Sequence, residues 1–136
     1  MLKLYYPKTN TSPEICFSPE ERIFSLRGIS SPEDVRGIYY PVIEWLIKYI
    51  DSLLKENTSP FTINDPLKLQ VDLAYFNSSS AKFLYDIFLE LKRLDAAKIP
   101  VLVEWIYDEE DPDLLEAGQD IATLVEMIFV FVPKSK

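Results

Sequence analysis

The 136-residue sequence contains no histidine. This absence excludes every mechanism that needs an imidazole, including Ser-His-Asp and Cys-His nucleophiles, HExxH zinc sites and imidazole proton shuttles. The single cysteine, Cys16, allows neither an internal disulfide nor a multi-cysteine metal site, and such cysteine usage is typical of a reducing, cytoplasmic compartment. Because there are only three glycines, a glycine-rich phosphate-binding loop is excluded as well.

Basic residues are also scarce. Fourteen Lys and Arg stand against 22 Asp and Glu, so the formal net charge is −8. Nucleic acids and anionic membranes would repel such a surface, and we expect neither as a partner. No apolar run reaches the roughly 18 residues of a membrane span, and residues 1–6 do not have the pattern of a signal peptide.

The length and the 48% hydrophobic content predict a single domain over residues 13–133, preceded by a loosely ordered lead-in over residues 1–12. Residues 14–18 and 22–28 are short strand-like runs. Pro19 between them favours a type I turn, so together they predict a β-hairpin.

Helical spacing of apolar residues follows from Val35 to Leu54. Ser31 is predicted as the cap of this helix and Pro32 as its first residue. Pro41 interrupts the pattern and predicts a kink or a short turn, because proline has no backbone N–H to donate. A loop is expected over residues 56–66.

The rest of the chain alternates between strands and helices. The apolar patterns predict strands over residues 67–75, 99–107 and 127–132, a helix from near Ser78 to Leu94, and a helix capped by Asp111 that ends near Val125. Residues 99–107 are nearly all apolar, which favours a strand covered on both faces. The order β-β-α-β-α-β-α-β predicts an α/β fold with a mostly parallel, mixed sheet and packed helices.

Right-handed crossovers place the strand-to-helix loops at one edge of such a sheet, where α/β domains usually carry their function. These loops are residues 28–33, 76–80 and 108–113. The second contains Asn77, Ser78, Ser79 and Ser80, whose hydroxyl groups at a helix N-terminus are suited to accept a phosphoryl group. The alternative is that these residues only cap the helix.

Three further features have structural explanations. The acidic loop 108–113 lacks the glycine and ligand spacing of an EF-hand, so no metal site is predicted. Asp72 and Glu104 would form an acid/base pair only if the fold brought them together. Cys16 within a strand is typical of a small buried apolar side chain. No catalytic residue and no cofactor are predicted.

Four segments together resemble the SiaC family of regulatory phosphoproteins, which is similar in fold to STAS (anti-anti-sigma) domains. They are Gly28-Ile29-Ser30-Ser31-Pro32-Glu33, Tyr39-Tyr40-Pro41-Val42-Ile43-Glu44-Trp45-Leu46, Tyr75-Phe76-Asn77-Ser78-Ser79-Ser80-Ala81-Lys82, and Glu104-Trp105-Ile106-Tyr107-Asp108 followed by Gly118-Gln119-Asp120. The resemblance implies a non-enzymatic switch in bacteria. On this resemblance we expect a dedicated Ser/Thr kinase to add a phosphate and a PP2C-type phosphatase to remove it. We also expect the unmodified form to bind and activate a diguanylate cyclase, an enzyme that makes cyclic di-GMP and promotes biofilm.

The family pattern reads Asn-Thr-Ser-Ser, with the threonine phosphorylated. The matching position here is Ser78, and Ser79 is the second candidate acceptor. The predicted partner-binding residues are Ser30, Ser31, Glu33, Asn77, Ser79 and Ser80. The alternatives are a constitutive scaffold or interaction subunit and, with less support, a small carboxylate-based enzyme or ligand-binding domain.

Overall fold

The computed structural model describes residues 1–56 and 59–135. It contains one six-stranded sheet, whose strands lie side by side in chain order. The strands are β1 (Leu4–Tyr6), β2 (Glu14–Ser18), β3 (Ile23–Ser30), β4 (Leu67–Phe76), β5 (Val101–Asp108) and β6 (Phe129–Lys134), and the helices are α1 (Val35–Lys55), α2 (Ser78–Ala96) and α3 (Pro112–Val125). β1, β2 and β3 pair antiparallel, while β3 to β6 pair parallel. The predicted hairpin and the α/β fold with a mixed sheet are confirmed.

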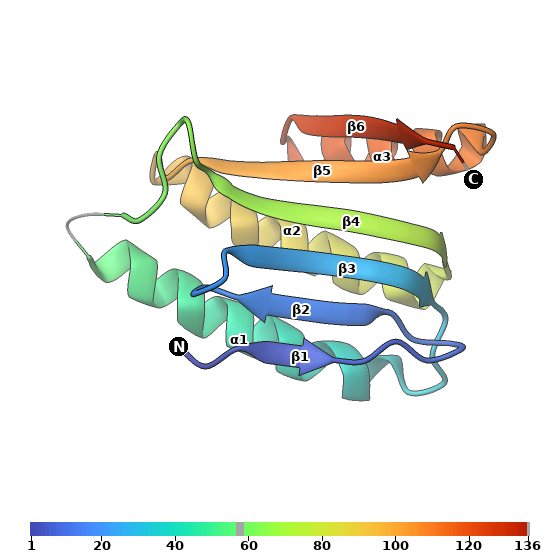
Figure 1. Cartoon of the computed structure of the whole chain (residues 1–136), viewed down its shortest axis with the longest axis horizontal. Helices are drawn as coiled ribbons and strands as arrows, with labels where there is room; N and C mark the ends of the chain where they lie inside the picture. The colour runs from blue at the N-terminus through green and yellow to red at the C-terminus, as the bar shows by residue number, and fades with distance from the viewer. Residues whose placement is uncertain (57–58, 136) are drawn as a thin grey trace.

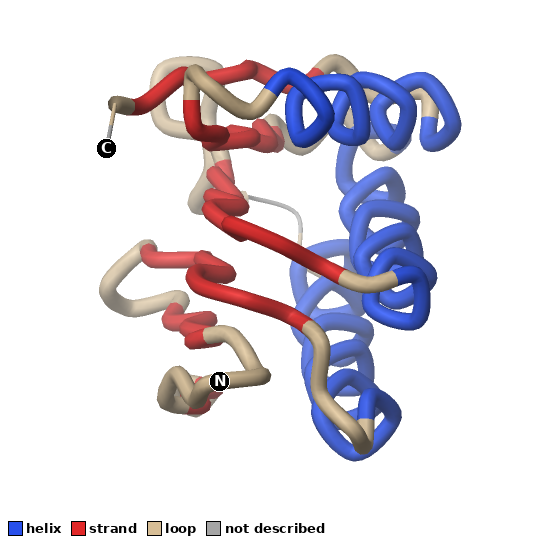
Figure 2. The backbone as a smooth tube through the Cα atoms, turned by 90° about the vertical axis from the view of Figure 1, so that its right-hand side faces the viewer, coloured by secondary structure: helices blue, strands red, loops and turns tan. Residues whose placement is uncertain are grey.

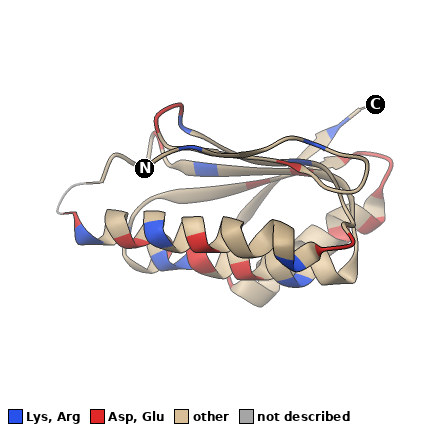
Figure 3. Ribbon diagram, turned by 90° about the horizontal axis from the view of Figure 1, so that it is seen from below, with Lys and Arg blue, Asp and Glu red and all other residues tan. Residues whose placement is uncertain are grey.

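All three helices lie on the same face of the sheet (Figures 1 and 2). Seen from below, the sheet forms one layer and the helices form the other (Figure 3). The prediction that residues 99–107 are covered on both faces is therefore wrong. Val103 and Trp105 of β5 are buried beneath the helices, whereas Leu102 and Ile106 alternate with them and are half-buried on the open face. The nearly continuous apolar sequence of this strand did not reveal whether helices cover one face of the sheet or both.

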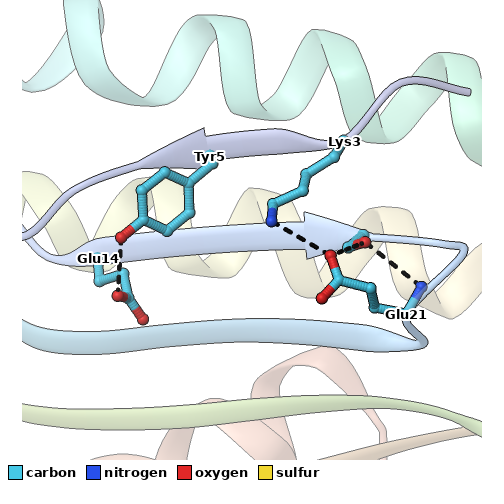
Figure 4. Close-up of polar contacts among 5 residues, drawn as sticks. Lys3, Tyr5, Glu14 and Glu21 are labelled. Carbon is cyan, nitrogen blue, oxygen red and sulfur yellow. Dashed lines mark hydrogen bonds and ion pairs between the residues drawn. The ribbon is translucent and has the colours of Figure 1, made fainter.

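A short edge strand lies within residues 1–12, which were expected to be a loose lead-in. β1 pairs with β2, and polar side chains of β1 and of the residue before it contact β2 and the turn after β2 (Figure 4). The Tyr5 hydroxyl donates to Glu14 at 3.1 Å, and the Lys3 ammonium lies 3.2 Å from the Glu21 carboxylate. The hydrogen bond from Lys3 lowers the pKa of Glu21. Three residues are too few to show a strand periodicity, so the pattern of the sequence did not reveal β1.

The helix α1 begins later than predicted and continues through Pro41. Its cap is Asp34 rather than Ser31, because the Asp34 carboxylate accepts a hydrogen bond from the Gly37 backbone N–H at 3.0 Å. The missing N–H of Pro41 leaves the carbonyl of Gly37 without a helical donor. Both residues are exposed, so water can bind that carbonyl and the helix does not need to break there.

The core lies between the sheet and the helices. The apolar side of α1 packs through Tyr39, Val42, Leu46 and Ile50, which are all buried, and α2 contributes a similar row from Phe83 to Leu94. The predicted start and end of α3 are confirmed, with Asp111 as cap and Val125 as the last residue. Part of the predicted loop 56–66, at residues 57–58, lies outside the described residues.

Candidate functional site

The carboxyl ends of β3, β4 and β5 lie at the same edge of the sheet (Figure 1). Ser30, the last residue of β3, pairs in register with Phe76, the last residue of β4. The backbone N–H of Asn77 then donates to the Ser30 carbonyl at 3.0 Å, so β3 is tied directly to the start of α2. The three predicted loops therefore share one edge, as the alternation of strands and helices indicated.

Asn77 is the cap of α2. Its side-chain oxygen accepts from the Ser80 backbone N–H at 2.9 Å, and its carbonyl accepts from the Ala81 N–H at 2.9 Å. Ser78 and Ser79 follow as the first two helical residues, and both are exposed. A phosphoryl group on either hydroxyl would stand in solvent at the positive end of the helix dipole, which favours an anion. The described hydrogen bonds of the interior do not include either hydroxyl.

The third serine of this run has a different environment. Ser80 is 0% exposed, and its hydroxyl donates to the carbonyl of Ser30 at 2.9 Å. The Ser30 hydroxyl, also 0% exposed, lies 2.8 Å from the Ser80 hydroxyl and 2.6 Å from the phenol oxygen of Tyr39. Burial raises the pKa of the Tyr39 phenol, so it remains protonated as part of this buried hydroxyl cluster.

The burial of this cluster contradicts two of the predicted partner contacts. Ser30 and Ser80 are sealed inside the domain and bonded to each other, so neither side chain can touch a docking protein. Their role is to join β3, α1 and α2. The available signal was helical spacing, because Ser80 lies three, four and seven residues before the buried Phe83, Leu84 and Ile87 and therefore shares their face of α2.

The remaining predicted contacts lie at the surface of the same edge. Glu33, Ser79 and Ser78 are exposed, while Ser31 and Asn77 are half-buried. The backbone N–H of Ser31 donates to the Thr11 carbonyl at 2.8 Å, which holds the β3–α1 loop in place.

The two carboxylates considered for acid/base chemistry lie elsewhere, on the open face of the sheet. Asp72 pairs with Lys134 and lies 3.8 Å from the Arg27 guanidinium. Glu104 accepts from the Gln70 side chain at 2.9 Å. Both carboxylates are thus engaged in a polar ladder across the strands. This arrangement links neighbouring strands across the open face and accounts for both carboxylates structurally.

The acidic loop and the cysteine also have structural roles. The Asp111 carboxylate accepts from the Leu114 N–H at 3.1 Å and so caps α3. Within residues 1–56 and 59–135, no group of three or more acidic or cysteine side chains is arranged to hold a metal ion. Cys16 is buried, and desolvation raises the pKa of its thiol, which disfavours the reactive thiolate. None of the helices in the described ranges is both long and apolar enough to cross a membrane.

One surface feature was not predicted from the sequence. A cavity of about 300 Å³ lies between the first turns of α1 and α2, beside the exposed serines. Its lining residues are Val35, Arg36, Tyr40, Ser79, Lys82 and Phe83. The sequence shows a basic residue near the start of each helix, Arg36 in α1 and Lys82 in α2. Only the packing of α1 against α2 brings these two residues to one cavity.

Comparison with known proteins agrees with this geometry. The model of the SiaC family regulatory phosphoproteins matches residues 6–134. An uncharacterized protein of Pseudomonas aeruginosa strain UCBPP-PA14 is 27% identical over 120 residues, which cover 88% of this chain and 87% of that protein. The crystal structure of apo-SiaC from P. aeruginosa superposes with a TM-score of 0.79 at 25% identity, over 99% of this chain and 100% of that one. A SiaC structure determined in complex with the diguanylate cyclase SiaD, which it activates, has a TM-score of 0.82 at 24% identity, over 96% of this chain and 99% of the matched chain.

Proposed function

Because this chain belongs to the SiaC family of regulatory phosphoproteins, we propose that it is a phosphorylation-controlled switch acting on a diguanylate cyclase. In its unphosphorylated form it binds and activates the cyclase. Phosphorylation at Ser78 ends that interaction. The P. aeruginosa SiaC, whose structure was determined with the cyclase SiaD that it activates, supports the choice of partner.

The observation that carries the proposal is the contrast within one helical turn. Ser78 is exposed at the first position of α2, whereas Ser80, two residues later, is locked into the buried hydroxyl cluster. A phosphate can therefore be added to Ser78 and removed again without disturbing the interior. The fold remains intact in both states, and only the charge of the surface changes.

The modification itself requires two enzymes. A Ser/Thr kinase transfers the γ-phosphoryl group of ATP to the Ser78 Oγ. The new P–O bond forms as the bond to the β-phosphate oxygen breaks, ADP leaves, and the hydroxyl proton passes to solvent. A PP2C-type phosphatase hydrolyses the phosphoserine with water and releases inorganic phosphate. Because ATP and cyclic di-GMP signalling belong to the cytoplasm, the switch operates there.

The phosphate acts on binding through charge and desolvation. A phosphoserine carries about −1.5 to −2 charges at pH 7. Burying a charge against a partner surface that offers no matching cation costs up to about 3–5 kcal/mol, and about 3 kcal/mol already corresponds to a loss of about a hundredfold in affinity. Neutral Ser78 incurs no such cost, so the unmodified form is the binding-competent state.

The experiment that tests this proposal is incubation of the protein with ATP and the kinase encoded nearest to its gene, followed by intact-mass measurement. We expect the addition of one phosphoryl group, which the Ser78→Ala variant does not acquire and the Ser79→Ala variant does. Loss of the modification in Ser79→Ala alone would move the acceptor to Ser79. No gain of mass in the unsubstituted protein would favour a constitutive scaffold subunit instead.

A further inference from the structure

The four arginines of the sequence differ in their surroundings. Arg22, Arg27 and Arg93 each lie within 4.0 Å of a carboxylate, at distances of 2.9, 3.8 and 2.5 Å. The side chain of Arg36 makes no hydrogen bond or ion pair with any residue in the described part of the chain. It is exposed at the second position of α1, where it lines the cavity beside Ser79. In a protein with a net charge of −8, an arginine without a carboxylate partner is available for an external or newly added anion.

A second cation borders the same cavity. The Lys82 ammonium lies 2.9 Å from Asp86 and 4.7 Å from the centre of the Phe83 ring, so it is held along α2 at the rim. Phe83 forms the floor together with Tyr40, whose ring packs edge-on against it at 5.6 Å. Two acidic residues of these helix starts already have partners: Asp86 pairs with Lys82, and the Asp34 carboxylate is occupied in capping α1.

We infer that the cavity between Arg36 and Lys82 is a receptor for the phosphoryl group carried by the first turn of α2. This inference rests on the proposed function, and it specifies how the phosphorylated state is held. Ser79 lines the cavity directly, and Ser78 precedes it in the same helical turn. A phosphate on this turn gains a bidentate partner in the Arg36 guanidinium and a further cation in Lys82. The ion pair then joins α1 to α2 at the edge of the sheet.

The receptor gives the phosphate two effects on the surface. It neutralises Arg36, which the unmodified protein leaves free to pair with an acidic side chain of a partner. It also fills the space beside Tyr40, a residue that is 55% exposed in the unmodified protein. Both changes remove features on which a docking protein can gain affinity.

The test is a ³¹P NMR titration of protein that carries phosphoserine at position 78, installed during synthesis so that no kinase or cyclase is needed. The second pKa of phosphoserine is about 6, and a guanidinium nearby lowers it because it favours the dianion. We expect the Arg36→Gln substitution to raise this pKa by about 0.5 or more, and Arg36→Lys to raise it less. High salt should reduce the difference.

The matched control is Lys55→Gln. It removes the same charge from the same helix, at a position about 28 Å away along the axis. We expect it to leave the phosphate pKa unchanged, and circular dichroism of each unmodified variant verifies the fold. A second preparation carries phosphoserine at position 79 instead of 78. If Arg36→Gln leaves the phosphate pKa unchanged in both preparations, the inference is overturned. A rise in the phosphate pKa at position 79 alone would support the receptor and identify Ser79 as the residue whose phosphate occupies it. Failure of the kinase reaction would instead count against the proposed function alone.

Discussion

The hydroxyl oxygens of Ser30 and Tyr39 lie 2.6 Å apart in the interior of the protein, directly beneath the exposed start of α2. Ser30 belongs to the end of β3 and Tyr39 to the second turn of α1, and Ser80 of α2 completes the cluster. This cluster of hydrogen bonds thus fixes the positions of three elements around the proposed phosphorylation site. The site is exposed, but the elements that carry it are rigidly joined from below.

Removal of the buried hydroxyl at position 80 should destabilise the protein, whereas removal of the exposed one at position 78 should not. Ser80→Ala deletes the hydrogen bonds to the Ser30 carbonyl and hydroxyl, and we expect a loss of about 1–3 kcal/mol in the free energy of unfolding. Ser78→Ala changes a solvated side chain and should stay within about 0.5 kcal/mol. Urea unfolding of both variants measures the difference, and equal stabilities would show that the cluster contributes nothing.

The alkaline stability of the protein should depend on Tyr39. The charged form of tyrosine is the phenolate, and burial raises the pKa of Tyr39 in the folded state. Above the unfolded value of about 10, the unfolded chain therefore loses its proton first, and stability falls as the pH rises further. Below about pH 10 the contribution is fully present.

Tyr39→Phe tests this dependence. The variant should be less stable than the unsubstituted protein at about pH 8, because it lacks the hydrogen bond to Ser30. Its urea midpoint should fall less steeply between about pH 10 and pH 11.5, since phenylalanine does not ionise. A residual slope is expected from Tyr49, whose pKa is raised by burial as well. Identical slopes for the two proteins would contradict the assignment.

Gly118 lies in α3 against the indole of Trp105. A Cβ at position 118 would come within 2.5 Å of the indole nitrogen, which itself donates to the Leu114 carbonyl at 3.1 Å. Gly118→Ala should therefore destabilise the protein by about 1–3 kcal/mol, even though alanine favours a helix by about 1 kcal/mol over glycine. The exposed neighbour Gln119→Ala serves as the control within the same helix. Thermal unfolding of Gly118→Ala at or above the midpoint of the control would show that the indole can move aside.

The alternation of apolar runs with capped helices was sufficient to predict the order of the longer elements and the edge that carries the site. Asp111, Pro112 and Asn77 act at their helix starts as local chemistry requires. The inward direction of Ser80 was missed although its spacing from Phe83 and Leu84 places it on the apolar face of α2. The other missed features depend on tertiary contacts. β1 is defined by its pairing with β2. The Arg36 cavity requires α1 and α2, which begin 43 residues apart at Val35 and Ser78, to pack together.

The most direct measurement of the central claim is titration calorimetry of the diguanylate cyclase partner against three variants at one position. Ser78→Asp adds a negative charge, Ser78→Asn has nearly the same shape without the charge, and Ser78→Ala removes the hydroxyl. We predict that the aspartate weakens binding by at least about tenfold, equivalent to about 1.4 kcal/mol, while the asparagine and alanine variants bind as the unsubstituted protein does. Equal affinities for the aspartate and asparagine variants would contradict a switch that works through charge at Ser78.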